Sequence, residues 1–155
     1  MTDSPAFDPA FADLVAEGLA TVAADGDGSA ITVPSAKLFD EGQATLSPLG
    51  ETIVARASKA FGGLPVGAIQ VRGHTDGQPV HSLQFPSNWE FAFAQAIAVR
   101  RVLEEQGLGV AVSVASYGGR DPIGDNETPE GRKANRRVVF ALTPVRAPAT
   151  LEPEL

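Results

Sequence analysis

The stretch Gly73-His74-Thr75-Asp76 decides the fold, because it pairs with a second polar motif far along the chain. That motif is Gly131-Arg132-Lys133-Ala134-Asn135-Arg136-Arg137-Val138. The residues before it, Ala68-Ile69-Gln70-Val71-Arg72, alternate in polarity like a half-buried strand. Asp76 is therefore expected on a loop at the end of that strand, where a rigid scaffold commonly carries functional side chains. The second motif feeds into 138–142, a short apolar run typical of a buried strand. Two polar clusters beside two strands predict one shared site.

Two segments with helical spacing carry clear start signals. The first, 49–61, follows Ser47-Pro48, which supplies a cap and a proline at the first helical position. The second begins at Ser87 and runs to about Gln106, because Ser87 and Glu90 have the spacing of a capping box. Trp89, in the first turn of that helix, is expected to anchor the core rather than to form a platform for a sugar.

The remaining pattern completes an alternation of helices and strands. Strands are expected over 29–33 and 110–115, and Thr128-Pro129 is placed to begin a short helix before the last strand. This order predicts an α/β (α+β) two-layer sandwich, with helices packed on one face of a roughly four-stranded mixed sheet.

The two ends of the chain are expected to lie outside that unit. Residues 1–28 are predicted to form an amphipathic helix and a turn, with an apolar stripe that covers the domain's own core or, alternatively, a partner surface. The stripe consists of Phe7, Phe11, Leu14, Val15, Leu19 and Val22. Residues 29–143 would form the main domain, and 144–155, with three prolines, a flexible tail.

Composition narrows the classes of function. The 155 residues carry a formal charge of −7, which argues against a nucleic-acid partner, since phosphate binding needs clustered Lys and Arg. There is no cysteine, so neither a disulfide framework nor a thiolate zinc site is available. The first residues lack the segments of a secretory signal, and no apolar run approaches the roughly 20 residues of a membrane span. An excised domain and a stand-alone protein both remain open.

The two motifs resemble those of the OmpA-like peptidoglycan-binding domains, and the resemblance runs from about residue 30 to about residue 142. Phe85-Pro86-Ser87-Asn88-Trp89-Glu90 is similar to the branch that contains MotB stators and type VI secretion anchors, and 80–84 favours the anchor form. The loop 34–48, with Leu38-Phe39 and Gly42, resembles a further segment of the family. The resemblance implies the sandwich fold and a non-catalytic module of the periplasm and cell envelope.

The resemblance also implies a ligand, the diaminopimelate of the peptidoglycan stem peptide, whose side chain ends in an ammonium and a carboxylate when it is not cross-linked. Asp76 matches the residue that accepts from the ammonium, Thr75 belongs to the same loop, and Asn88 matches the asparagine of the following helix. Gln95 stands where the family has an arginine that grips the carboxylate. The loss of that charge is expected to cost roughly 1–3 kcal/mol of binding.

The second motif contributes the other expected site residues. Arg132 and Arg136 either compensate for the missing arginine or pair with a carboxylate that holds the last helix against the sheet. Asn135 is expected to brace the loop of Asp76 rather than to touch the ligand. With these three, the predicted peptidoglycan-binding set is Thr75, Asp76, Asn88, Gln95, Arg132, Asn135 and Arg136.

Other chemistries find less support. His74, His81 and Asp76 fall short of the ligand set of a usual zinc site, so no metal is predicted. A triad of Ser82 or Ser87 with His74 and Asp76 lacks a nucleophile elbow, so no enzyme is predicted. No cofactor is expected either.

Two functions therefore remain. The first is a periplasmic module that binds the stem peptide and anchors an envelope machine, with weakened affinity because of Gln95. The second is a structural domain of the same fold that has lost its ligand and serves in homodimerisation or in the assembly of a secretion or motor complex.

Overall fold

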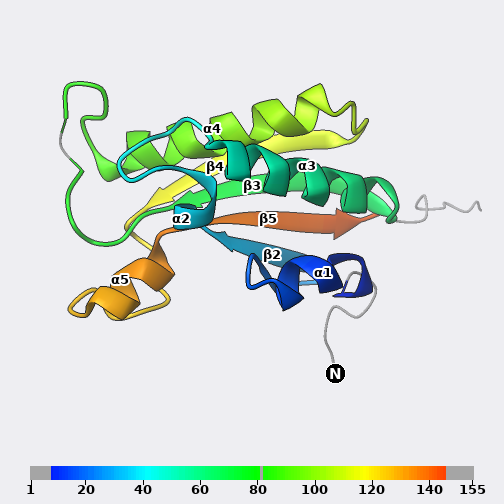
Figure 1. The fold of residues 1–155 in the computed structure, drawn as a ribbon, viewed down its shortest axis with the longest axis horizontal. Helices are drawn as coiled ribbons and strands as arrows, with labels where there is room; N and C mark the ends of the chain where they lie inside the picture. Colours follow the sequence, from blue (N-terminus) through cyan, green and yellow to red (C-terminus); the bar gives the residue numbers. More distant parts are fainter. Residues whose placement is uncertain (1–7, 81, 146–155) are drawn as a thin grey trace, which may run out of the picture.

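The computed structural model describes residues 8–80 and 82–145, which fold into a mixed sheet with helices on one face (Figure 1). Expectations for Phe7, for His81 and for the tail beyond residue 145 therefore fall outside the described residues. In chain order the elements are η1 (Asp8–Phe11), α1 (Ala12–Ala16), β1 (Thr21–Asp25), β2 (Gly28–Pro34), α2 (Ser35–Leu38), α3 (Pro48–Gly62), β3 (Val66–His74), α4 (Asn88–Glu105), β4 (Ala111–Gly118), α5 (Pro129–Asn135) and β5 (Arg137–Pro144).

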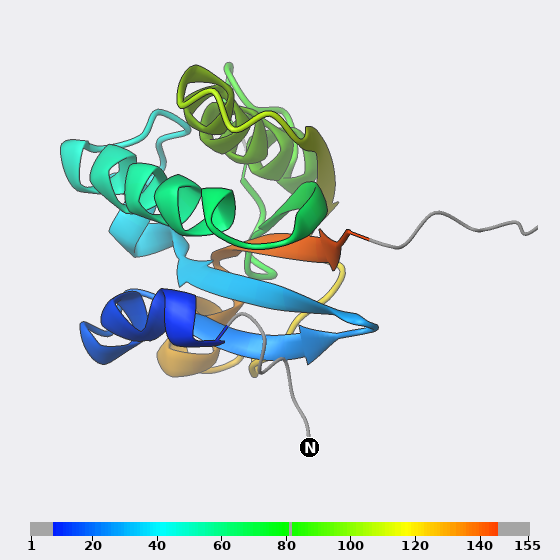
Figure 2. The ribbon, with the colours of Figure 1, turned by 90° about the vertical axis from the view of Figure 1, so that its right-hand side faces the viewer.

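The sheet has five strands in the order β1-β2-β5-β3-β4. Strands β3 and β4 are parallel, as expected for two strands joined by the crossover helix α4, and the other neighbours are antiparallel. Helices α1, α3 and α4 lie on the same side of the sheet, with α4 against β3 and β4 (Figure 2). The predicted α/β sandwich is confirmed. The strand that the sequence analysis missed is β1.

The N-terminal segment departs from its prediction. The helix ends near Ala16, because Gly18 adopts a left-handed φ of 75° and closes it. The Gly18 N–H donates to the Val15 carbonyl and the Leu19 N–H to the Leu14 carbonyl, the pairing of a Schellman motif. The chain then enters β1, so the expectation of one helix through Val22 was wrong.

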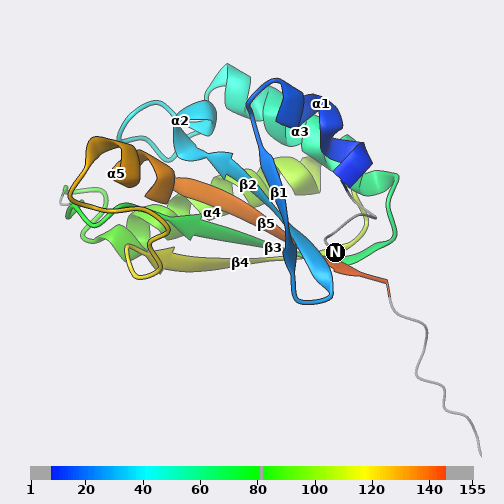
Figure 3. The same cartoon turned by 90° about the horizontal axis from the view of Figure 1, so that it is seen from below.

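The hairpin of β1 and β2 forms one edge of the sheet, and in the view from below it passes in front of the other strands (Figure 3). Asp25, at the end of β1, comes within 3.5 Å of Arg72 on β3. This ion pair links the hairpin to β3, from which β5 separates it in the sheet.

The core lies between the sheet and the helices. The rings of Phe11, Phe61 and Phe140 follow one another at centroid distances of 5.4 Å and link η1, α3 and β5. Phe11, Leu14 and Leu19 are buried in this core, so the described part of the N-terminal stripe packs on the domain itself, as expected, except for Val15, which is exposed.

The predicted helix starts are confirmed. The Ser47 hydroxyl accepts from the Gly50 N–H at 3.0 Å, and the Thr128 hydroxyl accepts from the Gly131 N–H at 3.0 Å. Ser87 caps α4 more loosely, at 3.5 Å from the Glu90 N–H, and its hydroxyl contacts the Glu90 carboxylate. Over the described residues, none of the helices is both long enough and apolar enough to cross a membrane.

Candidate ligand-binding site

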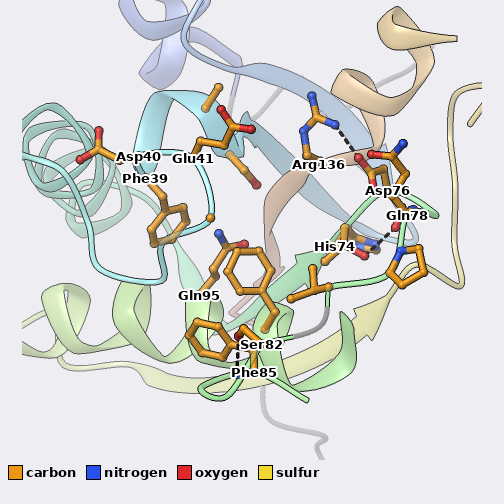
Figure 4. Close-up of a pocket in the computed structure, with 17 residues that line it drawn as sticks. Phe39, Asp40, Glu41, His74, Asp76, Gln78, Ser82, Phe85, Gln95 and Arg136 are labelled. Carbon is orange, nitrogen blue, oxygen red and sulfur yellow. Dashed lines mark hydrogen bonds and ion pairs between the residues drawn. The ribbon is translucent and has the colours of Figure 1, made fainter. Parts of the chain in front are cut away.

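A pocket of about 720 Å³ opens at the end of β3, a volume ordinary for a small-ligand site. Its walls come from α2 and the loop after it, from the loop after β3, from the first turns of α4 and from the residue that joins α5 to β5. Figure 4 shows the side chains converging on it from these separate segments. Its charged and polar lining residues include Asp40, Glu41, His74, Asp76, Gln95 and Arg136.

Asp76 is the carboxylate that the fold holds most firmly in this pocket. Its Oδ1 accepts from the Gln78 N–H at 2.9 Å, and its Oδ2 accepts from Arg136 Nη1 at 2.5 Å. The Asp76 side chain is only 9% exposed, whereas that of Arg136 is 46% exposed. The two predicted motifs therefore meet, as expected, and they meet through this ion pair.

The loop that carries Asp76 is fixed by its neighbours. The Thr75 N–H donates to the Gly118 carbonyl, and its hydroxyl donates to the Asp76 carbonyl, both at 2.8 Å. Asn88, at the start of α4, donates to the Asp76 and Gln78 carbonyls and accepts from the Val80 N–H. Thr75 is one of the residues that line the pocket. Asn88 is not among them, and it supports the loop through these hydrogen bonds.

Asn135 is fully buried and organises the loop between β4 and α5. Its Oδ1 accepts from the N–H groups of Ile123 and Gly124, and its Nδ2 donates to the Gly124 carbonyl and to Asn126 Oδ1. Asn126 Oδ1 in turn accepts from the Gly77 N–H. The expected bracing of the Asp76 loop by Asn135 therefore passes through Asn126 rather than through a direct bond.

The arginines around Asn135 have separate roles. Arg132 Nη1 donates to the Asn126 carbonyl at 2.9 Å and lies outside the pocket lining. Arg137 is 5% exposed and donates to the Asn135 and Asp121 carbonyls at 3.0 Å. Of the two arginines in the predicted set, the structure brings only Arg136 into the pocket.

Gln95 is 3% exposed and lines the pocket from the side of α4. Its Nε2 donates to the carbonyl of Gln43 at 3.0 Å, in the loop between α2 and α3. That loop is closed locally by the Gln43 N–H, which donates to the Asp40 carbonyl. Gln95, which stands where the family has an arginine, is thus hydrogen-bonded to the loop between α2 and α3.

His74 lies at the end of β3, stacked on Tyr117 at a centroid distance of 4.8 Å. Burial, followed by the charge of Arg137, lowers the pKa of His74 from 6.5 to about 4, so the ring is neutral near pH 7. Its Nδ1 is buried without a hydrogen-bond partner among the described residues.

Two features of the site differ from the sequence-based expectation: an acidic rim that no motif predicted, and an aromatic ring that lies outside the core. Asp40 and Glu41 line the pocket opposite Asp76, and only their position in the Leu38 to Gly42 segment could have indicated this. Trp89 was expected in the core, but its side chain is 51% exposed and stacks on Phe93, one turn further along α4, at a centroid distance of 5.3 Å.

This fold and paired motifs define a known class. The chain belongs to the OmpA family, whose model matches residues 38–136. Domains of this family are non-catalytic, which confirms the prediction that the chain is not an enzyme.

The chain is similar to several individual members of this family. Motility protein B of Bacillus subtilis is 33% identical over 128 residues, which cover 81% of this chain and 49% of that protein. The cell wall anchor of the T6SS from Pseudomonas aeruginosa has a TM-score of 0.81 at 26% identity and covers 91% of this chain and 99% of that one. The periplasmic domain of Helicobacter pylori MotB has a TM-score of 0.70 at 31% identity, covering 81% and 82%. The chain spans about half the length of the curated relatives it matches.

Proposed function

We propose that this chain is a periplasmic module that binds peptidoglycan through the diaminopimelate of the stem peptide. Its similarity to a cell wall anchor and to a periplasmic MotB domain supports the ligand and the compartment. The module would then anchor an envelope machine to the wall, as the sequence motifs imply. No nucleic acid and no cofactor enter this function.

The placement of Asp76 is the observation that carries the proposal. A carboxylate has several acceptor positions, and only some are used by Gln78 and Arg136. The backbone and Asn88 hold the loop, so Asp76 is oriented before a ligand arrives. A charge-assisted hydrogen bond from the ligand ammonium to Asp76 fits this arrangement.

Affinity for a diamino acid with a free carboxylate is expected to be low. A neutral amide that already donates to Gln43 replaces the cation that would grip this carboxylate. The difference between a charged and a neutral hydrogen bond corresponds to roughly 1–3 kcal/mol. Arg136 offers partial compensation, because it lines the pocket and is half exposed, although Asp76 offsets its charge.

A second candidate is a domain of the same fold that has lost the ligand and serves in homodimerisation or in the assembly of an envelope complex. Gln95 favours it, because this residue carries no charge and its amide is hydrogen-bonded to the carbonyl of Gln43.

Calorimetric titration with a stem peptide that contains diaminopimelate tests the proposal. Asp76→Ala should abolish binding, since it removes the partner of the ammonium. Asp13→Ala, which removes an exposed carboxylate on α1, is the matched control and should bind like the parent. Circular dichroism should show that both variants fold.

Binding that survives in Asp76→Ala would contradict the proposed site. A parent that does not bind, together with a Gln95→Arg variant that does, would establish the second candidate instead.

A further inference from the structure

We propose that this pocket selects a diamino acid whose side-chain carboxyl is amidated, so that the ligand presents an ammonium and a primary carboxamide instead of an ammonium and a carboxylate. The inference rests on the proposed function and specifies the chemical form of its ligand. Three features of the pocket support it: the orientation of Gln95, the match of its free atoms to an amide, and the charge of the lining.

The orientation of the Gln95 amide follows from its partner. The atom 3.0 Å from Nε2 is the Gln43 carbonyl oxygen, which can only accept, so the nitrogen of Gln95 must face it. The side chain is buried, and Figure 4 shows its amide facing the interior of the pocket. Oε1 is therefore the atom that Gln95 leaves for a ligand, together with at most the second N–H of Nε2.

A carboxylate is a poor match for these atoms. Both of its oxygens are acceptors when it is ionised, so one of them would meet the Gln95 acceptor. A primary carboxamide carries N–H donors and a carbonyl acceptor, and it can bond to Oε1 and to the remaining N–H of Gln95 at the same time. An arginine in this position would offer donors only and would therefore prefer the carboxylate.

The charges around the pocket act in the same direction. Among the described residues, Asp40, Glu41 and Asp76 line it against one guanidinium, that of Arg136, which is paired with Asp76. His74 adds no positive charge near pH 7, because burial lowers its pKa to about 4. This excess of negative charge attracts an ammonium and opposes a second carboxylate, so amidation removes the unfavourable charge from the ligand.

Two synthetic stem peptides that differ only at this group, carboxylate or carboxamide, test the inference by calorimetry on the parent chain. The carboxamide peptide should bind about tenfold more tightly, the size expected for one matched hydrogen bond against one unsatisfied acceptor. Gln95→Arg should reverse the preference. Gln95→Leu, which keeps an uncharged side chain of similar length, should remove it.

Gln106→Arg is the matched control, since it adds the same charge at the exposed end of α4 and should leave the preference unchanged. Equal or tighter binding of the carboxylate peptide by the parent would overturn the inference while leaving the proposed function standing, and would indicate that Arg136 takes the carboxylate. A parent that binds neither peptide would overturn the proposed function and this inference with it.

Discussion

Among single residues, His74 makes the stability of the fold depend on pH. Its pKa is lowered from 6.5 to about 4 by burial and by Arg137, so between these values the unfolded chain binds a proton that the folded chain does not. The free energy of unfolding is therefore highest above pH 6.5. It falls by up to about 3 kcal/mol as the pH drops towards 4.

His74→Phe should flatten this dependence, because a phenyl ring preserves the stacking on Tyr117 and cannot take up a proton. Urea unfolding of both proteins between about pH 7 and pH 4 measures the difference in slope. Parallel curves for the two proteins would show that His74 does not titrate on unfolding.

Gly73 is a second residue at which the structure predicts a large effect of substitution on stability. A Cβ at this position would lie 2.2 Å from the Ala92 carbonyl oxygen, so β3 and α4 could not keep their distance. Gly73→Ala should therefore destabilise the fold by about 2 kcal/mol or more, as overpacking does. Gly63→Ala, where the nearest atom would be 3.8 Å away, is the control and should cost much less in the same unfolding experiment.

The sequence predicted that two motifs share one place in the fold. The motif of Gly73 to Asp76 and that of Arg132 to Val138 do meet, but the ion pair between Asp76 and Arg136 through which they meet became visible only in the structure. The bond from Gln95 to Gln43 could not be predicted, since it depends on how a loop of irregular backbone returns to α4. Trp89 was misplaced because its position in the first turn of a helix does not show whether its ring meets the sheet, and the ring stacks on Phe93 instead.

At the scale of elements, the loop between β4 and α5 depends on one buried amide. Asn135→Ala should cost about 2 kcal/mol or more, because it leaves the N–H groups of Ile123 and Gly124 and the Asn126 side chain without their partner. The release of Asn126 should also loosen Gly77 beside Asp76, so ligand affinity should fall as well as stability. Unfolding and calorimetry on one variant measure both, and a stable variant with unchanged affinity would contradict the proposed bracing.

The junction of α1 and β1 shows how a local signal was overlooked. Gly18, with a φ of 75°, ends the helix, and Thr21-Val22 begins the strand with two β-branched residues. The helical spacing of Leu19 and Val22 masked this change of period. Gly18→Ala should destabilise the chain by about 1 kcal/mol, the cost of a left-handed residue with a side chain, and an unchanged unfolding midpoint would contradict the Schellman closure.

At the scale of the whole molecule, the N-terminal segment and the main domain share one core. We propose that residues 8–28 are an integral layer of the fold rather than an appendage, since Phe11, Leu14 and Leu19 are buried in the main cluster and β1 pairs with β2. A chain that starts at Ser29 should lose about 5 kcal/mol of stability, from the burial of such side chains. An unchanged midpoint in denaturant unfolding would contradict this.

The overall architecture was more predictable than its edges. The alternation of capped helices and apolar strands indicated helices on one face of a mixed sheet, because those signals are local and recur along the chain. The fifth strand depended on the pairing of β1 with β2, which periodicity in the sequence does not encode.

The proposed function requires a stem-peptide ligand to enter the pocket beside Asp76. The most direct measurement is a titration of the isotope-labelled chain with such a peptide, followed by the amide resonances in nuclear magnetic resonance spectra. We expect shifts to concentrate on the backbone of Thr75 to Gln78, on Gln43 and on the side-chain amide of Gln95. Shifts confined to another face of the sheet, or no shifts at all, would contradict binding of the peptide in this pocket.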